Sequence, residues 1–230
     1  MKTEFNPTTG GANMARRSFL RYAGAGAAAI AVMGAASCSK DKVIPNNSSA
    51  TDIGMDDFGI LNYAYALEQL EAAFYLQVVA TPYSGMNSIE TAYLTDIRDH
   101  EVLHRDFFKK ALGSKAIGAL TPDFSKIDFG SRNNVLMAAK AFEDLGVQAY
   151  DGAGYLIKDA GYLTIAGKIV SVEARHAALI SNLISPGSFV PADQVNSDGL
   201  NKAASIAEVL TQANTYLKTK VSAVNYNYKP

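Results

Sequence analysis

The sequence predicts an all-α protein, in which four long helices form a bundle and an additional helix follows near the C-terminus. Apolar residues recur at intervals of three and four over four long segments, which is the spacing of one helix face. Stretches that contain glycine and proline separate these segments. No strand pattern competes with this reading, and a hydrophobic content of 48% supports a packed core.

The expected elements follow the chain in order. The first helix carries Leu61 and Phe74 on one face and ends before the turn residues 81–85. Gly113 ends the second helix, and residues 113–131 form a long crossover to the third helix, a connection that some four-helix bundles use. The expected helices span residues 56–79, 88–112, 132–150, 162–184 and 201–218, and residues 226–230 are expected to be loose.

Residues 1–37 are interpreted as a targeting segment that does not belong to the fold. Arg16 and Arg17 precede an apolar run of small residues at 22–36, a pattern typical of a twin-arginine export signal. The run is too short and too rich in glycine and alanine for a confident membrane span. Residues 38–55 are polar and are expected to form a flexible tether.

Cys38 stands where the apolar run ends, after Ala35, Ala36 and Ser37, and this pattern resembles the lipid-attachment site of bacterial lipoproteins. It is the single cysteine of the chain. We therefore expect an exported protein, held by a lipid anchor at Cys38 in the cell envelope, in the periplasm or at the outer membrane. Two lipid groups together bind a membrane more firmly than the single chain that is only marginal. The alternative is an ordinary signal peptide with an incidental cysteine.

Composition excludes several classes of function. The net charge of −1 offers no basic field that would recruit nucleic acid. A single cysteine excludes a disulfide framework and a thiolate zinc site within one chain. Any metal site would have to use carboxylate and imidazole ligands, which suit iron, manganese or zinc better than Cu(I).

Two Glu-x-x-His motifs carry the clearest chemical signal, Glu101-x-x-His104 and Glu173-x-x-His176. Residues three apart lie on one face of a helix, so the carboxylate and the imidazole of each motif can reach one metal ion. The chain has three histidines, and two of them stand in these motifs, one in each half. Two such helices, with one glutamate from each of two further helices, form the dinuclear site of four-helix carboxylate proteins.

An internal repeat of helix pairs supplies the two further glutamates. The stretch that contains Glu68 and Tyr75 aligns with the stretch that contains Glu143 and Tyr150. A Glu-x-x-His motif follows each of these glutamates on the next expected helix. One such motif is common by chance on an exposed helix face, whereas two in matching repeat positions favour a set of metal ligands.

The repeat predicts two divalent ions held by six ligands: Glu68, Glu101, His104, Glu143, Glu173 and His176. The motif glutamates would bridge the ions, each histidine would bind one ion, and the two remaining glutamates would complete the ends. Four carboxylates balance the formal charge of two divalent cations. Without metal the buried carboxylates would repel one another, and some would be protonated.

Several other side chains are candidates for orienting the ligands by hydrogen bonds. These candidates are Tyr75, Tyr150, Asp99, Asp144 and Arg175. Tyrosines in such positions are more often core residues than participants in redox chemistry. His100 is adjacent to Glu101 and therefore lies on a different face, so it is expected at the surface or behind the ligands rather than among them.

The phrases LEQLEAAFY, HEVLHRDF, FEDLGVQAY and VEARHAAL occur in this order along the chain. They resemble the ferritin-like superfamily and, more narrowly, the exported ferritin-like domain of bacterial desiccation-related proteins. The resemblance covers residues 56–185 and implies a ferritin-like four-helix bundle with a di-iron or di-manganese site on the same six ligands. Glu71 is an alternative or additional metal ligand in the first helix, but it aligns with Gly146, which favours Glu68.

Two functions are compatible with these patterns. The first is a di-metal oxidoreductase that acts on oxygen or peroxide in a ferroxidase, peroxidase or catalase-like reaction; no residue is assigned as catalytic. The alternative is a non-catalytic metal-binding or structural envelope protein that keeps the ferritin-like fold. Residues 186–230, a loop and a helix, are expected either to pack on the bundle or to make a homodimer contact.

Overall fold

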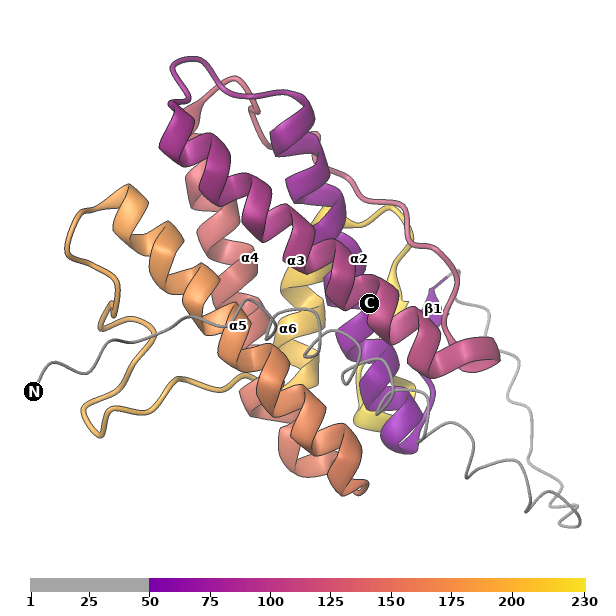
Figure 1. Cartoon of the computed structure of the whole chain (residues 1–230). Coiled ribbons are helices and arrows are strands. Elements are labelled where there is room, and N and C mark those ends of the chain that lie inside the picture. Colours follow the sequence, from indigo (N-terminus) through magenta and orange to yellow (C-terminus); the bar gives the residue numbers. More distant parts are fainter. Residues whose placement is uncertain (1–49) are drawn as a thin grey trace, which may run out of the picture. The chain divides into compact units, whose positions relative to one another are not determined.

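Residues 50–230 are described by the computed structural model, and four long helices in this range form a bundle (Figure 1). The all-α bundle that the sequence predicts is therefore confirmed. The expected signal peptide, Cys38 and most of the expected tether lie outside the described residues. The long helices are α2 (Asp56–Ala80), α3 (Ser88–Leu112), α4 (Arg132–Ala153) and α5 (Ala160–Ile184). Short 3-10 turns are η1 (Gly113–Lys115), η2 (Gly154–Leu156), η3 (Asn214–Tyr216) and η4 (Val224–Tyr226).

Two helix pairs build the bundle. α2 packs mainly against α3, and α4 packs mainly against α5, as a repeat of helix pairs requires. A short connection joins the helices of each pair, whereas the chain between Leu112 and Arg132 crosses from one pair to the other (Figure 1). As a result α2 and α5 run in one direction and α3 and α4 in the other. The beginnings of α2 and α5 lie at the same end of the bundle as the ends of α3 and α4.

Local sequence fixes where three of these helices begin. The Asn87 side chain accepts the backbone N–H of Glu90, and the Glu90 carboxylate accepts the backbone N–H of Asn87 in return. Ser131 and Asp159 cap α4 and α5 with one side-chain hydrogen bond each. These caps satisfy backbone N–H groups that have no partner within the helix and thereby fix the residue at which each helix begins.

The crossover between α3 and α4 contributes to the hydrophobic core. Its residues Phe124 and Phe129 pack on Phe74 of α2, with ring centroids 5.9 and 5.7 Å away. Phe142 of α4 packs on the same ring at 5.0 Å. Aromatic pairs at such distances stabilise a core beyond the area they bury. The cluster therefore joins the first helix pair to the second.

The C-terminal helix is shorter than the sequence predicts. The expected helix spans residues 201–218, but α6 covers Ile206–Ala213. Ser205 caps its start. At its end, the Asn214 side chain bonds both the backbone N–H and the backbone carbonyl of Val221, at 2.8 Å each. A side chain that satisfies the backbone in this way favours a turn over a continued helix.

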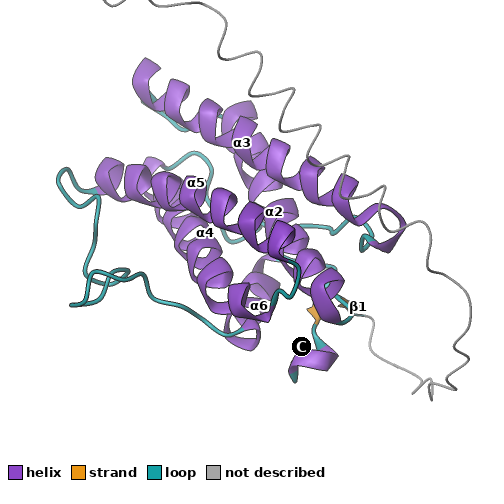
Figure 2. Cartoon of the chain, turned by 60° about the horizontal axis from the view of Figure 1, so that its bottom comes forward, coloured by secondary structure: helices purple, strands orange, loops and turns teal. Residues whose placement is uncertain are grey.

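The C-terminal segment packs on the bundle, with α6 against α4 (Figure 2). Residues 185–205 form the long loop that leads to α6. Gly152 allows the loop to approach α4 closely, because a Cβ atom there would lie 1.8 Å from the backbone oxygen of Ala204. The backbone N–H of Ala204 donates to the carbonyl of Gln148 at 3.1 Å.

Two segments that were expected to be loose are held in the fold. β1 (Thr51–Asp52) pairs in parallel with β2 (Val221–Ser222). The Tyr226 hydroxyl donates to a backbone carbonyl at the start of α2, at 3.1 Å. Residues 51–55 of the expected tether and residues 226–228 of the expected loose tail are therefore held in the fold. Strands of two residues are too short to leave an alternating pattern in the sequence.

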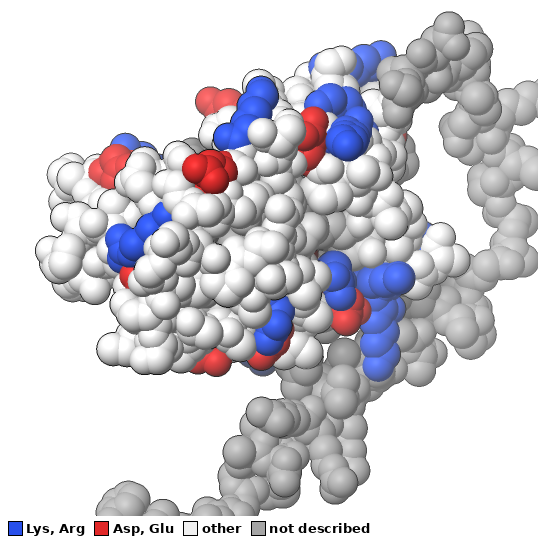
Figure 3. Space-filling model, turned by 90° about the horizontal axis from the view of Figure 1, so that it is seen from above, with Lys and Arg blue, Asp and Glu red and all other residues white. Residues whose placement is uncertain are grey.

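The surface carries charges of both signs. Lysine, arginine, aspartate and glutamate side chains are interspersed over the face that Figure 3 shows. Of the helices between residues 50 and 230, none is both long enough and apolar enough to span a membrane.

Candidate metal centre

The four long helices bring the six expected ligand residues together inside the bundle. These residues are Glu68 on α2, Glu101 and His104 on α3, Glu143 on α4, and Glu173 and His176 on α5. All four glutamates are 0% exposed. Burying an ionised carboxylate is strongly unfavourable unless a counter-charge or a metal accompanies it. Four of them at one place therefore indicate a site for cations.

The ligand atoms form two groups that share two carboxylates. One group contains Glu68 and His104, the other contains Glu143 and His176, and both contain Glu101 and Glu173. Within each group the ligand atoms all lie within 4.8 Å of one another. The sharing follows from the helix faces, because α3 and α5 each present a glutamate one turn before a histidine. Each group could hold one metal ion.

The ligand atoms of the site lie close together as ion pairs, but eight of them make no hydrogen bond of good geometry to any described residue. His104 Nδ1 is 2.8 Å from a Glu173 oxygen, and His176 Nδ1 is 2.9 Å from a Glu101 oxygen. Within the described part of the chain, eight buried atoms of the site have no hydrogen-bond partner. They are both oxygens of Glu101 and Glu173, one oxygen of Glu68 and of Glu143, and Nδ1 of His104 and His176. Buried polar atoms without partners are rare in folded proteins, and a bound ion is one of their explanations. The donor set fits iron or manganese.

Two tyrosines hold the unshared glutamates, and each does so across the two helix pairs. Tyr75 of α2 donates to Glu143 of α4 at 2.5 Å. Tyr150 of α4 donates to Glu68 of α2, also at 2.5 Å. Each glutamate thus uses one oxygen for a tyrosine and leaves the other for the site. Both tyrosines were predicted as partners of the ligands, and the structure places them there.

The charges of the site favour cations at its centre. Burial would lower the pKa of both histidines, but the carboxylates, with Glu143 the largest contributor, raise the pKa of His176 to about 12. Glu68 makes the largest contribution to raising the pKa of His104 well above its ordinary value. Burial would raise the pKa of Glu173, but the two histidines lower it to about 2. Burial raises the pKa of Glu143 to about 7, although His176 opposes this shift. In the metal-free protein the imidazolium charges thus partly neutralise the carboxylates.

Glu71 is a further buried carboxylate beside the site, but it belongs to neither group of ligand atoms. Burial raises its pKa well above the ordinary value, and the other glutamates, Glu101 foremost, raise it further. A Cβ atom on Gly146 would lie 3.0 Å from a Glu71 oxygen. Glycine at position 146 therefore leaves room for the Glu71 side chain, and the structure uses Glu68 as the α2 member of the site.

His100 contacts the site from outside. Its Nδ1 lies 2.9 Å from Nε2 of His176, and the two rings are stacked with centroids 5.2 Å apart. If His176 held a metal through Nδ1, its Nε2–H would donate to Nδ1 of His100, and this bond would fix the orientation of the His176 ring. The sequence alone left open whether His100 lies at the surface or behind the ligands. His100 precedes His104 by four residues, so the two lie on one helix face, and this spacing could have predicted that His100 lies beside the site.

Three other predicted partners of the ligands lie elsewhere. Asp99 is exposed and pairs with Arg98 at 2.7 Å. Asp144 pairs with Lys140 on the same helix and lines a cavity beneath the loop after α5. Arg175 donates to a backbone carbonyl one turn earlier in α5. Each of them is close in sequence to a ligand, but neighbouring residues on a helix point about 100° apart.

A four-helix bundle with buried carboxylates and imidazoles at its centre defines a class of metal-binding helical proteins. Comparison with protein families matches the chain to the ferritin-like domain over residues 56–186. The chain therefore belongs to the ferritin-like domain family. No curated protein matches it.

Proposed function

We propose that the protein binds two iron or manganese ions, one in each group of ligand atoms, and uses them in redox chemistry on oxygen or peroxide. The observation that carries the proposal is the set of eight unpartnered donor atoms, arranged in two groups that share Glu101 and Glu173. A single ion would leave Nδ1 of the histidine and one oxygen of the unshared glutamate in the other group without a hydrogen-bond or metal partner within residues 50–230. Four carboxylates also balance the formal charge of two divalent ions.

The surrounding residues have defined tasks in this proposal. A pair of redox-active ions would supply the electrons for the reduction of oxygen or peroxide. Tyr75 and Tyr150 orient the unshared glutamates, so that one oxygen of each stays directed at the site. Preorganised ligands of this kind need no rearrangement when the metal charge changes. Burial of all four glutamates excludes bulk water and strengthens these interactions.

The cellular place of the protein is part of the proposal. The protein is exported through the twin-arginine signal and anchored by lipid at Cys38, like the desiccation-related ferritin-like proteins that it resembles. Arg16 and Arg17, the apolar run after them, and the position of the single cysteine support this assignment. A tether of polar residues would then place the metal centre in the cell envelope, either in the periplasm or at the outer membrane.

Metal reconstitution tests the metal centre. The full chain is loaded anaerobically with Fe(II) or Mn(II), freed of excess metal, and analysed for metal per chain. We expect about two ions per chain, the stoichiometry of a two-metal site. Oxygen and peroxide consumption by the loaded protein then distinguishes an oxidoreductase from a protein that only binds metal. A folded protein that takes up neither metal contradicts the proposal.

Cell fractionation tests the anchor. The Cys38→Ala variant should move from the membrane fraction to the soluble periplasmic fraction. Replacement of Arg16 and Arg17 by lysine should leave the protein in the cytoplasm. A wild-type protein that is found in the cytoplasm would contradict export, and a Cys38→Ala variant that stays in the membrane fraction would contradict the lipid anchor.

A further inference from the structure

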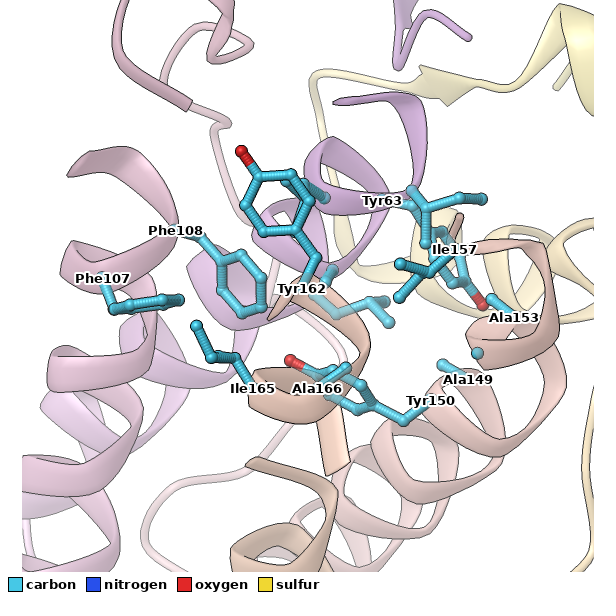
Figure 4. A pocket seen from close by; sticks show the side chains of 15 residues that line it. Tyr63, Phe107, Phe108, Ala149, Tyr150, Ala153, Ile157, Tyr162, Ile165 and Ala166 are labelled. Atoms are coloured by element: carbon cyan, nitrogen blue, oxygen red, sulfur yellow. The ribbon is translucent and has the colours of Figure 1, made fainter. Parts of the chain in front are cut away.

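An apolar pocket lies at the end of the bundle where α2 and α5 begin (Figure 4). Buried side chains of Tyr63, Leu67 and Ala149 line its inner part, and partly exposed Tyr162 and Ile165 line its outer part. The pocket is therefore a short recess that leads from the surface into the hydrophobic core. None of the six metal ligands lines it.

The pocket lies beside the metal centre along the helices. Ala64, which lines it, precedes Glu68 by one turn on α2, and Phe108 follows His104 by one turn on α3. One helical turn corresponds to about 5.4 Å along the axis. On α4 and α5 the lining residues are displaced from the ligands by two turns in the same direction along the bundle.

Tyr150 connects the pocket to the ligands. Its side chain lines the pocket (Figure 4). Its hydroxyl donates to Glu68 at 2.5 Å. A molecule in the pocket that touches the Tyr150 ring is thus one side chain away from a ligand. The same hydrogen bond occupies the Tyr150 hydroxyl, so this group is less available to a guest molecule.

The size and the chemistry of the pocket select a small apolar guest. It offers about 20 Å³ to the centre of a water-sized molecule, and about 10–15 Å³ is enough for one such molecule. Apolar cavities stay dry and take up apolar guests such as xenon. Tyr63 contributes a buried hydroxyl that has no hydrogen-bond partner among the described residues. Peroxide carries two donors and several acceptors, and one hydroxyl cannot replace its hydrogen bonds with water.

We propose that this pocket binds dioxygen and delivers it to the metal centre past Tyr150, a role that rests on the redox function proposed above. Dioxygen is small, uncharged and without hydrogen-bond donors, so it loses little on leaving water. The pocket thereby assigns dioxygen, rather than peroxide, as the molecule that enters by this route.

Xenon binding tests the pocket without any turnover. Crystals of the metal-free full chain are pressurised with xenon, which serves as the probe for a small apolar guest. A xenon peak between Ala64, Tyr150 and Ala166 is expected. If the pocket stays empty while xenon enters other cavities, the pocket does not take up apolar guests and the proposal is wrong.

A matched pair of substitutions on α5 tests delivery. Ala166→Leu fills the pocket, whereas Ala178→Leu places the same side chain in the separate cavity beneath the loop after α5. Ala166→Leu, which adds three carbon atoms, should abolish the xenon peak and lower oxygen consumption at low oxygen concentration by about tenfold or more, since one methylene of mismatch in an apolar pocket already costs about tenfold. Ala178→Leu should change neither. Ile165→Phe, at the outer part of the pocket, is the second variant if Ala166→Leu does not fold.

The possible results distinguish a failure of the pocket proposal from a failure of the proposed redox function. A loaded wild-type protein that consumes neither oxygen nor peroxide overturns the redox function and delivery with it, whatever xenon does. If Ala166→Leu loses xenon but keeps the wild-type rate of oxygen consumption, delivery through this pocket is wrong while the redox function stands. If the rate of peroxide consumption falls as much as that of oxygen, the selectivity for dioxygen is wrong.

Discussion

The two helix pairs, α2–α3 and α4–α5, supply the same metal ligands in different surroundings. Each pair contributes one glutamate from its first helix and a Glu-x-x-His motif from its second. Two of the matching positions at which the pairs differ bear directly on the site. Glu71 in the first pair corresponds to Gly146 in the second, and His100 corresponds to Val172.

The two pairs thus supply a symmetric set of ligands, but the residues that contact these ligands differ between the pairs. The groups of ligand atoms mirror each other, and the two tyrosine bonds cross between the pairs in the same way. Only His176 has a histidine stacked on it among the described rings. α2 adds a further buried carboxylate, Glu71, next to the site. The two metal positions should therefore share their ligand types but differ in affinity.

The largest expected effect is a difference in metal content between variants of the shared and of the unshared glutamates. Glu101→Gln or Glu173→Gln removes a carboxylate from both groups, so each variant should lose both ions. Glu68→Gln or Glu143→Gln should lose one ion and keep the other. Metal per chain, measured after reconstitution and gel filtration, checks this order. Equal losses in all four variants would contradict the sharing.

The second-largest expected effect is the change of metal affinity with pH. Because the pKa values of His104 and His176 are raised, with that of His176 at about 12, both are protonated in the metal-free protein between pH 6 and pH 8. Each ion must displace one imidazolium proton, and the shared Glu101, whose pKa burial raises well above its ordinary value, must lose its proton as well, so affinity should rise at least tenfold for each pH unit. Below pH 7 the ion at Glu143 should show a steeper slope, because burial raises the pKa of that carboxyl to about 7.

Metal titrations at several pH values, in buffers of different ionisation enthalpy, measure both the affinity and the number of protons released. An affinity that does not change between pH 6 and pH 8 would show that the histidines bind metal without losing a proton, against this account.

Replacing His100 by the valine found at the matching position 172 should affect the affinity of one metal position only. His100→Val gives α3 the residue that α5 carries at the matching position 172 and removes the partner of His176. Loss of such a supporting bond lowers metal affinity about tenfold to a hundredfold. Stepwise titration should show this loss for one ion, while His100→Gln, which keeps an acceptor, should restore part of it. A loss at both positions would contradict the assignment to His176.

The smallest expected effect is on the free energy of unfolding and concerns the pair Glu71 and Gly146. Gly146→Ala brings a methyl group to 3.0 Å from a Glu71 oxygen and should destabilise the protein by about 1 kcal/mol, as mild overpacking does. In the Glu71→Ala background the same substitution should stabilise the protein by about 0.5–1 kcal/mol, because the space is then free and alanine favours a helix interior more than glycine does. Denaturant unfolding of the two single variants and the double variant gives the coupling energy. Strictly additive effects would show that Gly146 does not serve to accommodate Glu71.

The sequence predicted the parts of the site that depend on local spacing. The i, i+3 spacing and the repeat select six residues that the structure brings together, and helical periodicity predicts the four long helices. The supporting contacts join residues far apart in the chain: Tyr75 and Glu143 are separated by 68 positions, and His100 and His176 by 76. Such contacts depend on how the helices pack, which one sequence does not reveal.

The structure of the C-terminal segment also depends on contacts that the local sequence does not reveal. Its apolar pattern predicts a helix over 201–218, but the Asn214 side chain ends the helix early by bonding Val221. The parallel pairing of β1 with β2 joins the two ends of the described range and leaves no local signal. Neighbours of ligands in sequence, such as Asp99, were wrong candidates because adjacent helix positions face different ways.

The most direct test of the two-ion centre is anomalous X-ray scattering from crystals of the protein loaded with iron or manganese. The account predicts two anomalous peaks about 3.5–4 Å apart. One peak should lie between Glu68 and His104 and the other between Glu143 and His176, with Glu101 and Glu173 between the two. A single peak, or peaks away from these residues in a fully loaded protein, would contradict it.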